Sequence, residues 1–265
     1  MDERRLRHRL TMTGAVALGA AVLVAVSGVV PAGALQHRHH RNHRHETPHT
    51  SSQPGDLKAA RTRKTISQNW SGYVASGGRF TTVSGSWTVP AVNCSSTPNG
   101  VVALWVGIDG AGSKTVEQTG TFSACDQGSA SYAAWYEAFP ASSIILPNPV
   151  GPGDNMSATV TNTGPNTFSL VLTNNSRGWT STNNIQVRGR LASAEAIVEA
   201  PSLHGQIVPL ADFGSTGFSN VTVNGAPLSS TRGLQPVTMA SLGGVVKAVP
   251  SVLSGGSFSV SWRHA

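Results

Sequence analysis

The chain has 265 residues, which allows one large domain or two small ones. Its formal net charge is +7, but 11 of its 19 Lys and Arg residues precede residue 65. From Ile66 to Ala265 there are 8 basic and 8 acidic residues, so this region is neutral. A neutral region lacks the electrostatic footprint that binding to phosphate backbones requires, which excludes nucleic acid as the main partner.

The first 34 residues have the three parts of a secretory signal peptide. Four arginines lie between Arg4 and Arg9, and they precede an uncharged, mostly apolar run of 17 residues from Gly14 to Val30. Pro31 to Ala34 then ends in an A-x-A cleavage pattern. The alternative is an uncleaved anchor, but 17 residues are at the short end of what crosses ~30 Å of hydrocarbon. We therefore expect cleavage, secretion and no stable membrane association afterwards.

Residues 35–65 form a polar tract that contains six histidines among Arg, Ser, Thr and Pro. The tract has too few large apolar residues to offset the entropy cost of ordering the chain. We expect a disordered linker or a propeptide. In a propeptide the clustered histidines would gain charge below pH ~6.5.

From residue 66 onward the pattern is that of an all-β domain, with short runs of Val, Thr and aromatic residues between turns. Ala192 to Ala200 is the one helix-like window, and it is short enough to form a strand. Many short strands at this spacing predict a sandwich or a barrel, in one domain that spans residues 66–265. The expected strands lie at 80–83, 86–89, 102–108, 131–139, 156–160, 168–172, 183–191, 221–223 and 258–262.

The chain contains two cysteines, Cys94 and Cys125. In a secreted protein they most simply form one disulfide, and the alternative is two free structural thiols. After residue 66 the only histidines are His204 and His264. We therefore expect no zinc site, no metal and no cofactor, and an enzyme built on this domain would draw its acid–base groups from carboxylates.

Several carboxylates lie within apolar or aromatic runs. Glu137 follows Trp135-Tyr136, and Glu195 and Glu199 flank Ile197. Because strand residues two or four apart share a face, Glu195 and Glu199 would point the same way. Burial of such groups perturbs their pKa, which makes them candidates for function, although an edge strand with a solvated charged face would show the same pattern.

Four segments stand out in the region after residue 66: Asn69-Trp70-Ser-Gly, Trp105-Val-Gly-Ile-Asp109-Gly with Gln118-Thr-Gly, Ala134-Trp-Tyr-Glu137, and Ala194-Glu-x-Ile-Val-Glu199. Together they resemble the glutamic peptidases, also called the eqolisin or G1 family, which are secreted acid endopeptidases with a concanavalin-A-like β-sandwich of two antiparallel sheets. The resemblance covers residue 66 to the end and includes a weaker match at residues 210–218.

The resemblance implies that Gln118 and Glu199 are the catalytic pair. It also implies that Trp105, Asp109 and Glu137 shape and support the cleft, and Trp70 belongs to the same set. Ionised Glu199 would act as the general base on water, while the neutral amide of Gln118 would orient the water and hydrogen-bond the oxyanion. Glu117 is out of phase with Gln118 and is expected to face away from the cleft.

The sequence therefore predicts a secreted, monomeric endopeptidase that acts on proteins or peptides at acidic pH. Two alternatives remain. Paired carboxylates such as Glu137 and Glu199 would also serve a glycosidase or a carbohydrate-binding sandwich. The third possibility is a non-catalytic relative, since Ala133 and Ala200 stand where family members carry acidic residues.

Overall fold

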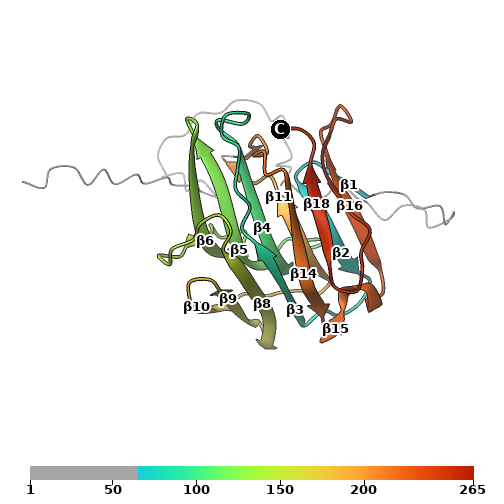
Figure 1. Ribbon diagram of the computed structural model, residues 1–265. Coiled ribbons are helices and arrows are strands. Elements are labelled where there is room, and N and C mark those ends of the chain that lie inside the picture. The colour runs from blue at the N-terminus through green and yellow to red at the C-terminus, as the bar shows by residue number, and fades with distance from the viewer. Residues whose placement is uncertain (1–64, 204) are drawn as a thin grey trace, which may run out of the picture.

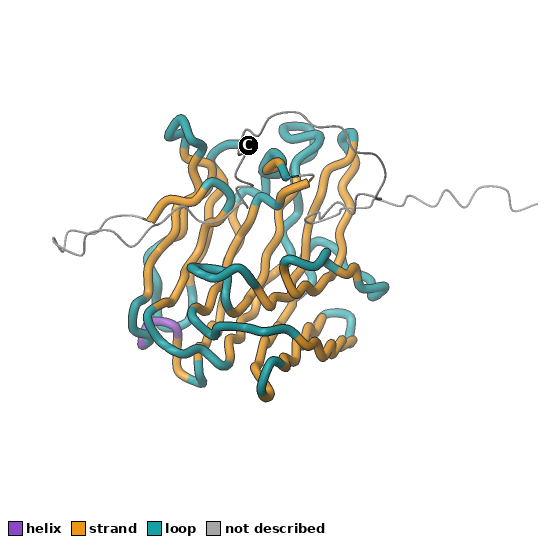
Figure 2. Tube along the Cα trace, turned by 180° about the vertical axis from the view of Figure 1, so that it is seen from behind, coloured by secondary structure: helices purple, strands orange, loops and turns teal. Residues whose placement is uncertain are grey.

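The computed structural model describes residues 65–203 and 205–265, which form strands and one 3-10 helical turn, η1 (Figures 1 and 2). The predicted signal peptide and residues 35–64 lie outside the described residues. The elements are β1 (Thr65–Ser67), β2 (Trp70–Ser76), β3 (Thr82–Thr88), β4 (Val101–Ile108), β5 (Val116–Asp126), β6 (Ser129–Phe139), β7 (Ile144–Ile145), β8 (Asn155–Gly164), β9 (Thr167–Asn174), β10 (Trp179–Gln186), β11 (Ser193–Glu199), β12 (Ser202–Leu203), β13 (Gln206–Ile207), β14 (Ser215–Val223), β15 (Ala226–Pro227), η1 (Leu228–Ser230), β16 (Leu234–Ala240), β17 (Val246–Pro250) and β18 (Phe258–Trp262).

The main sheet follows one hydrogen-bonded path, in the order β10-β9-β8-β3-β14-β18-β17-β16-β2-β11-β4-β5-β6-β7. This path folds back on itself, because β4 packs against β3 and β8 while β5 packs against β8 and β9 (Figure 1). All the pairs along it are antiparallel, and β1 joins the side of β16 in parallel. The predicted all-β sandwich is confirmed.

The folded-back sheet makes two layers, and apolar side chains fill the space between them. Trp87, Phe218 and Leu104 are almost completely buried there. A second apolar cluster, centred on Trp70, Trp105 and Trp135, lies on the other face of the layer that contains β2, β11, β4, β5 and β6. Each large apolar side chain buried in this way contributes roughly 1.5–3 kcal/mol. The second cluster gives this layer a buried outer face, and the predicted site residues Trp70, Trp105, Gln118, Glu137 and Glu199 lie there.

The strands expected at 80–83 and 86–89 form the single strand β3, and the strand expected at 221–223 begins at Ser215, as part of β14. The helix-like window forms strand β11, which pairs with β2 on one side and with β4 on the other. The strand expected at 183–191 is displaced toward the N-terminus and ends at Gln186. Beyond it the chain runs close to other groups, so that a Cβ on Gly189 would lie 2.9 Å from Asp109 Oδ2.

Cys94 and Cys125 form a disulfide, as predicted. The bridge joins the loop after β3 to the end of β5 and spans 31 residues of sequence. It therefore encloses β4 and most of β5, the two strands that carry the Trp105 and Gln118 segments. Within residues 65–203 and 205–265, no helix is long and apolar enough to cross a bilayer.

Candidate active site

The strand register places Gln118, Glu137 and Glu199 on one face of the layer. Glu199 on β11 lies opposite Ala103 on β4, two residues from Trp105. Gln118 on β5 lies between Gly107 on β4 and Glu137 on β6. Residues that lie directly opposite on neighbouring strands share a face, and so do residues two apart along a strand. By these pairings, the side chains of Gln118, Glu137 and Glu199 lie on the same face of the layer as Trp105.

The Glu199 carboxylate is held by donors that come from distant parts of the chain. Its Oε1 accepts a hydrogen bond of 3.0 Å from Asn69 Nδ2, and its Oε2 accepts one of 2.7 Å from Trp105 Nε1. Trp70 meets Trp105 edge to face, with ring centroids 5.0 Å apart. Burial raises the pKa of Glu199 to about 7, against the opposing effect of the hydrogen bonds from Trp105, Trp70 and Asn69. The two hydrogen bonds fix both oxygens of Glu199 in position.

Sequence reasoning gave Asn69 no role, although Asn69 belongs to the segment that pointed to Trp70. Its contact with Glu199 joins residues 130 positions apart, and no local pattern reports such a contact. Ser67 Oγ accepts hydrogen bonds from the backbone N–H groups of Asn69 and Trp70, which fixes the turn between β1 and β2. This turn sets the position of the Asn69 amide.

Gln118 and Glu137 form a buried pair. Gln118 Nε2 donates a hydrogen bond of 2.5 Å to Glu137 Oε2, and the two side chains are 5% and 1% exposed. Burial raises the pKa of Glu137 to about 8; the Gln118 hydrogen bond opposes this and the charge of Glu199 adds to it. Among the described residues no hydrogen bond joins Gln118 directly to Glu199. Glu137 is thus the direct partner of the Gln118 amide.

A glycine allows Trp105 to occupy its place beside this pair. Gly120 lies opposite Trp105 on one side and opposite Trp135 on the other. A Cβ on Gly120 would lie 2.7 Å from Trp105 Cβ and 2.1 Å from Leu104 O, closer than real contacts. The Gly of the Gln-Thr-Gly segment is therefore required by close packing of the strands.

Asp109 lies in a second acidic group at the ends of β4, β5 and β11. Its two carboxylate oxygens each accept a hydrogen bond of 2.7 Å, from the backbone N–H groups of Leu191 and Ala192. Glu195 Oε1 accepts from the backbone of Gly110 at 3.3 Å and of Ala111 at 3.2 Å. Asp109 thus fastens the loop after β4 to the chain that enters β11.

Glu117 completes this second group, on the opposite face of β5 from Gln118. It lies opposite Ile108, is fully buried, and neither of its carboxylate oxygens has a hydrogen-bond partner in the described residues. Burial, and then the charge of Asp109, raise its pKa to about 8. Burial also raises the pKa of Glu195 to about 8. Glu117 therefore faces away from the Gln118–Glu137 pair, whereas Glu195 lies opposite Gly107 on the face that carries Glu199 and Gln118, as the sequence predicted.

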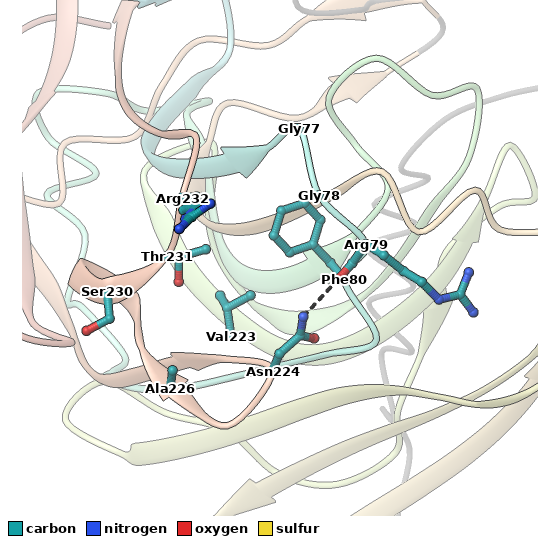
Figure 3. Close-up of a pocket in the computed structure, with 10 residues that line it drawn as sticks. All are labelled: Gly77, Gly78, Arg79, Phe80, Val223, Asn224, Ala226, Ser230, Thr231 and Arg232. Atoms are coloured by element: carbon teal, nitrogen blue, oxygen red, sulfur yellow. Dashed lines mark hydrogen bonds between the residues drawn. The ribbon is translucent and has the colours of Figure 1, made fainter.

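A cavity of about 290 Å³ lies elsewhere, between the β2–β3 loop and the β14–β15 turn (Figure 3). Asn224 bonds there to the backbone oxygen of Arg79, whose side chain points away from the other lining residues in Figure 3. None of the residues that line this cavity belongs to the surroundings of Glu199, and none of them carries a carboxylate. Its lining residues are Gly77, Gly78, Arg79, Phe80, Val223, Asn224, Ala226, Ser230, Thr231 and Arg232. In the part of the chain that the structure describes, no group of His, Cys, Asp or Glu is arranged to hold a metal ion.

Comparisons with known proteins find relatives by both sequence and structure. The sequence model of the Peptidase A4 family matches residues 68–262. Aspergillopepsin-2 from Aspergillus niger is 32% identical over 183 residues, which are 60% of this chain and 65% of that protein, so the match spans just under two thirds of its length. Scytalido-glutamic peptidase, solved with a peptide-based transition-state analogue, superimposes with a TM-score of 0.64 at 27% identity and covers 74% of this chain and 98% of its own. Aspergilloglutamic peptidase from Aspergillus niger gives a TM-score of 0.56 at 29% identity and covers 62% and 99%.

Proposed function

The chain belongs to the Peptidase A4, or eqolisin, family, and from this premise we propose that it is a glutamic endopeptidase that hydrolyses peptide bonds in proteins or peptides. The observation that carries the proposal is the Glu199 carboxylate, held by Trp105 and Asn69 on the same sheet face as Gln118. The peptide-based transition-state analogue bound by scytalido-glutamic peptidase supports a peptide substrate.

The proposed reaction uses one water and no metal or cofactor. Ionised Glu199 takes a proton from the water while the water oxygen attacks the carbonyl carbon of the scissile peptide bond. The negative charge that develops on the carbonyl oxygen accepts a hydrogen bond from the Gln118 amide. When the C–N bond breaks, Glu199 returns the proton to the leaving amine, which restores the carboxylate for the next cycle.

The supporting residues act through Glu199 and Gln118. Trp105 and Asn69 fix the two carboxylate oxygens, and Trp70 packs against Trp105. Asp109 keeps the chain that leads into β11 in place. Asp109 therefore supports the cleft through the backbone.

The pKa of Glu199 gives the proposed pH dependence a sign. A base with a pKa of about 7 is ionised to only about one hundredth at pH 5, and the ionised fraction rises tenfold per pH unit. Activity is then expected to increase from strongly acidic pH toward neutrality. The optimum is expected near neutrality, between the pKa of about 7 of Glu199 and the pKa of about 8 of the buried Glu137 carboxyl group.

Secretion and a monomeric state remain part of the proposal. The Cys94–Cys125 disulfide supports an oxidising destination, because such bonds persist in secreted proteins and are rare in the cytosol. Mass spectrometry of protein collected from culture medium would test secretion and locate the mature N-terminus. Light scattering of the same material would give the oligomeric state.

Digestion of casein by the purified protein between pH 3 and 9 tests the proposed function. Glu199→Gln and Gln118→Ala remove the base and the amide, and Asp126→Asn neutralises an exposed carboxylate at the end of β5 as a matched control. We expect the control to cleave like the wild type and both site variants to lose activity. No cleavage by the wild type at any pH would overturn the proposed function.

A further inference from the structure

The Gln118–Glu137 pair is short of one donor. Gln118 Nε2 donates to Glu137 Oε2, which leaves Gln118 Oε1 and Glu137 Oε1 buried without a hydrogen-bond partner. Both atoms are acceptors when Glu137 is ionised. Buried polar atoms are nearly always paired, so two unpaired acceptors in one contact need an explanation.

A single proton on Glu137 would give both unpaired oxygens a hydrogen-bond partner. A hydrogen on Glu137 Oε1 is a donor, and Gln118 Oε1 is the carbonyl acceptor of the same amide–carboxyl contact. The amide and the carboxylic acid would then form a ring with two parallel hydrogen bonds, one in each direction. The second N–H of Gln118 remains outside this ring.

We propose, on the basis of the proposed peptidase function, that Glu137 is a protonated positioning residue that holds the Gln118 amide by two hydrogen bonds and leaves its second N–H for the oxyanion. Gln118 makes the contact with the substrate, and Glu137 acts through it. The amide cannot flip while the ring is intact, because a reversed amide would place its NH₂ against the O–H donor.

The surroundings of Glu137 favour retention of its proton. The titratable group that acts on it is Glu199, a carboxyl group whose charge disfavours a second charge nearby. β5 presents Gln118 to it, and β7 on the other side of β6 consists of Ile144 and Ile145. Glu117 faces the other side of β5, and no described Lys or Arg pairs with Glu137. Burial and Glu199 together raise the pKa of Glu137.

Different carboxyl groups set the two limbs of the pH profile of activity. Glu199 must lose its proton, which sets the acidic limb, and Glu137 must keep its proton, which sets the basic limb. Glu137→Gln preserves the ring as an amide–amide pair that cannot ionise. Glu137→Ala removes the ring and frees the Gln118 side chain to rotate.

The test compares kcat and KM of casein-derived peptide hydrolysis for wild type, Glu137→Gln and Glu137→Ala between pH 4 and 9, with each rate divided by the folded fraction from circular dichroism. We expect Glu137→Gln to keep kcat within about threefold, to leave the acidic limb in place and to move the basic limb upward. Glu137→Ala is expected to lose about a hundredfold in kcat with little change in KM, as for loss of an oriented oxyanion donor. A Glu137→Gln variant as impaired as Glu137→Ala would overturn the proposal. A shift of its acidic limb would do so too, because that would show a charge on Glu137.

A second measurement does not depend on catalysis. Infrared difference spectra at pH 6 between the wild type and Glu137→Gln should show the carbonyl band of a protonated carboxylic acid that the variant lacks. A carboxylate band in its place would overturn the ring even in an active enzyme. If the wild type cleaves nothing, the proposed function fails while this spectrum still decides the state of Glu137.

Discussion

Replacing Glu117 by Gln tests how the buried acidic group links stability to pH. Glu117 is fully buried without a hydrogen-bond partner, and its pKa is raised from 4.5 to about 8. Because the folded pKa is above the unfolded one, the folded state binds more protons between these values. The contribution of Glu117 to stability is therefore fully present below about pH 4.5 and is lost as the pH rises through 8.

The size of this change in unfolding free energy follows from the pKa shift of Glu117. Each pKa unit corresponds to 1.36 kcal/mol, so a shift from 4.5 to about 8 costs about 4 kcal/mol of folding free energy at pH 8. That is a large part of the roughly 5–15 kcal/mol by which domains are stable. Glutamine has nearly the same shape and no charge, so Glu117→Gln should remove this pH dependence. Its buried amide costs about 1–3 kcal/mol at every pH, which leaves the slope unaffected.

The assay is urea unfolding followed by tryptophan fluorescence at pH 4, 6 and 8. We expect the loss of unfolding free energy between pH 4 and 8 to be about 3–4 kcal/mol smaller in Glu117→Gln than in the wild type. Asp126→Asn is the matched control, because Asp126 is exposed on the same strand. Parallel pH curves for wild type and Glu117→Gln would refute the reasoning, since Glu117 would then titrate normally in the fold.

Three further predictions concern the site and its frame. Trp105→Phe removes the N–H that Glu199 Oε2 accepts, so the pKa of Glu199 should rise and the acidic limb of kcat/KM should move upward by about one pH unit; an unmoved limb would show that this bond does not tune the base. Gly120→Ala places a methyl group against Trp105 and Leu104, and calorimetry should show a loss of about 1–3 kcal/mol or more; a variant as stable as wild type would contradict the close packing. Reduction of Cys94–Cys125, or Cys94→Ser with Cys125→Ser, should cost about 3–4 kcal/mol in urea unfolding, and an unchanged midpoint would deny the bridge a stabilising role.

The sequence predicted strands well where side-chain alternation and burial coincide. β18 begins and ends where expected, and β4 and β6 differ from the expected ranges by one or two residues at their first positions. β5 was not predicted, because its core-facing positions include Glu117, Thr119 and Ser123, which break the apolar pattern. Tertiary pairing on both sides decides such a strand, as it decides β11.

Some features of the site could be predicted from the sequence, and others could not. The resemblance to glutamic peptidases pointed to Gln118, Glu137 and Glu199 through short segments, and the strand register brings them to one face. Local sequence could not show that Asn69 reaches Glu199 or that Gln118 bonds to Glu137, since these contacts depend on how distant strands align. For the same reason it could not show that Asp109, Glu117 and Glu195 meet.

The central claim is that Glu199 is the base that activates water. Its most direct test is the kcat/KM profile for casein-derived peptides from pH 3 to 9, measured for wild type and Glu199→Gln at equal folded fraction. The account predicts a wild-type rate that rises with pH through a pKa near 7, and a variant that loses activity at every pH. Cleavage by Glu199→Gln at the wild-type rate, or a wild-type optimum at pH 3, would contradict it.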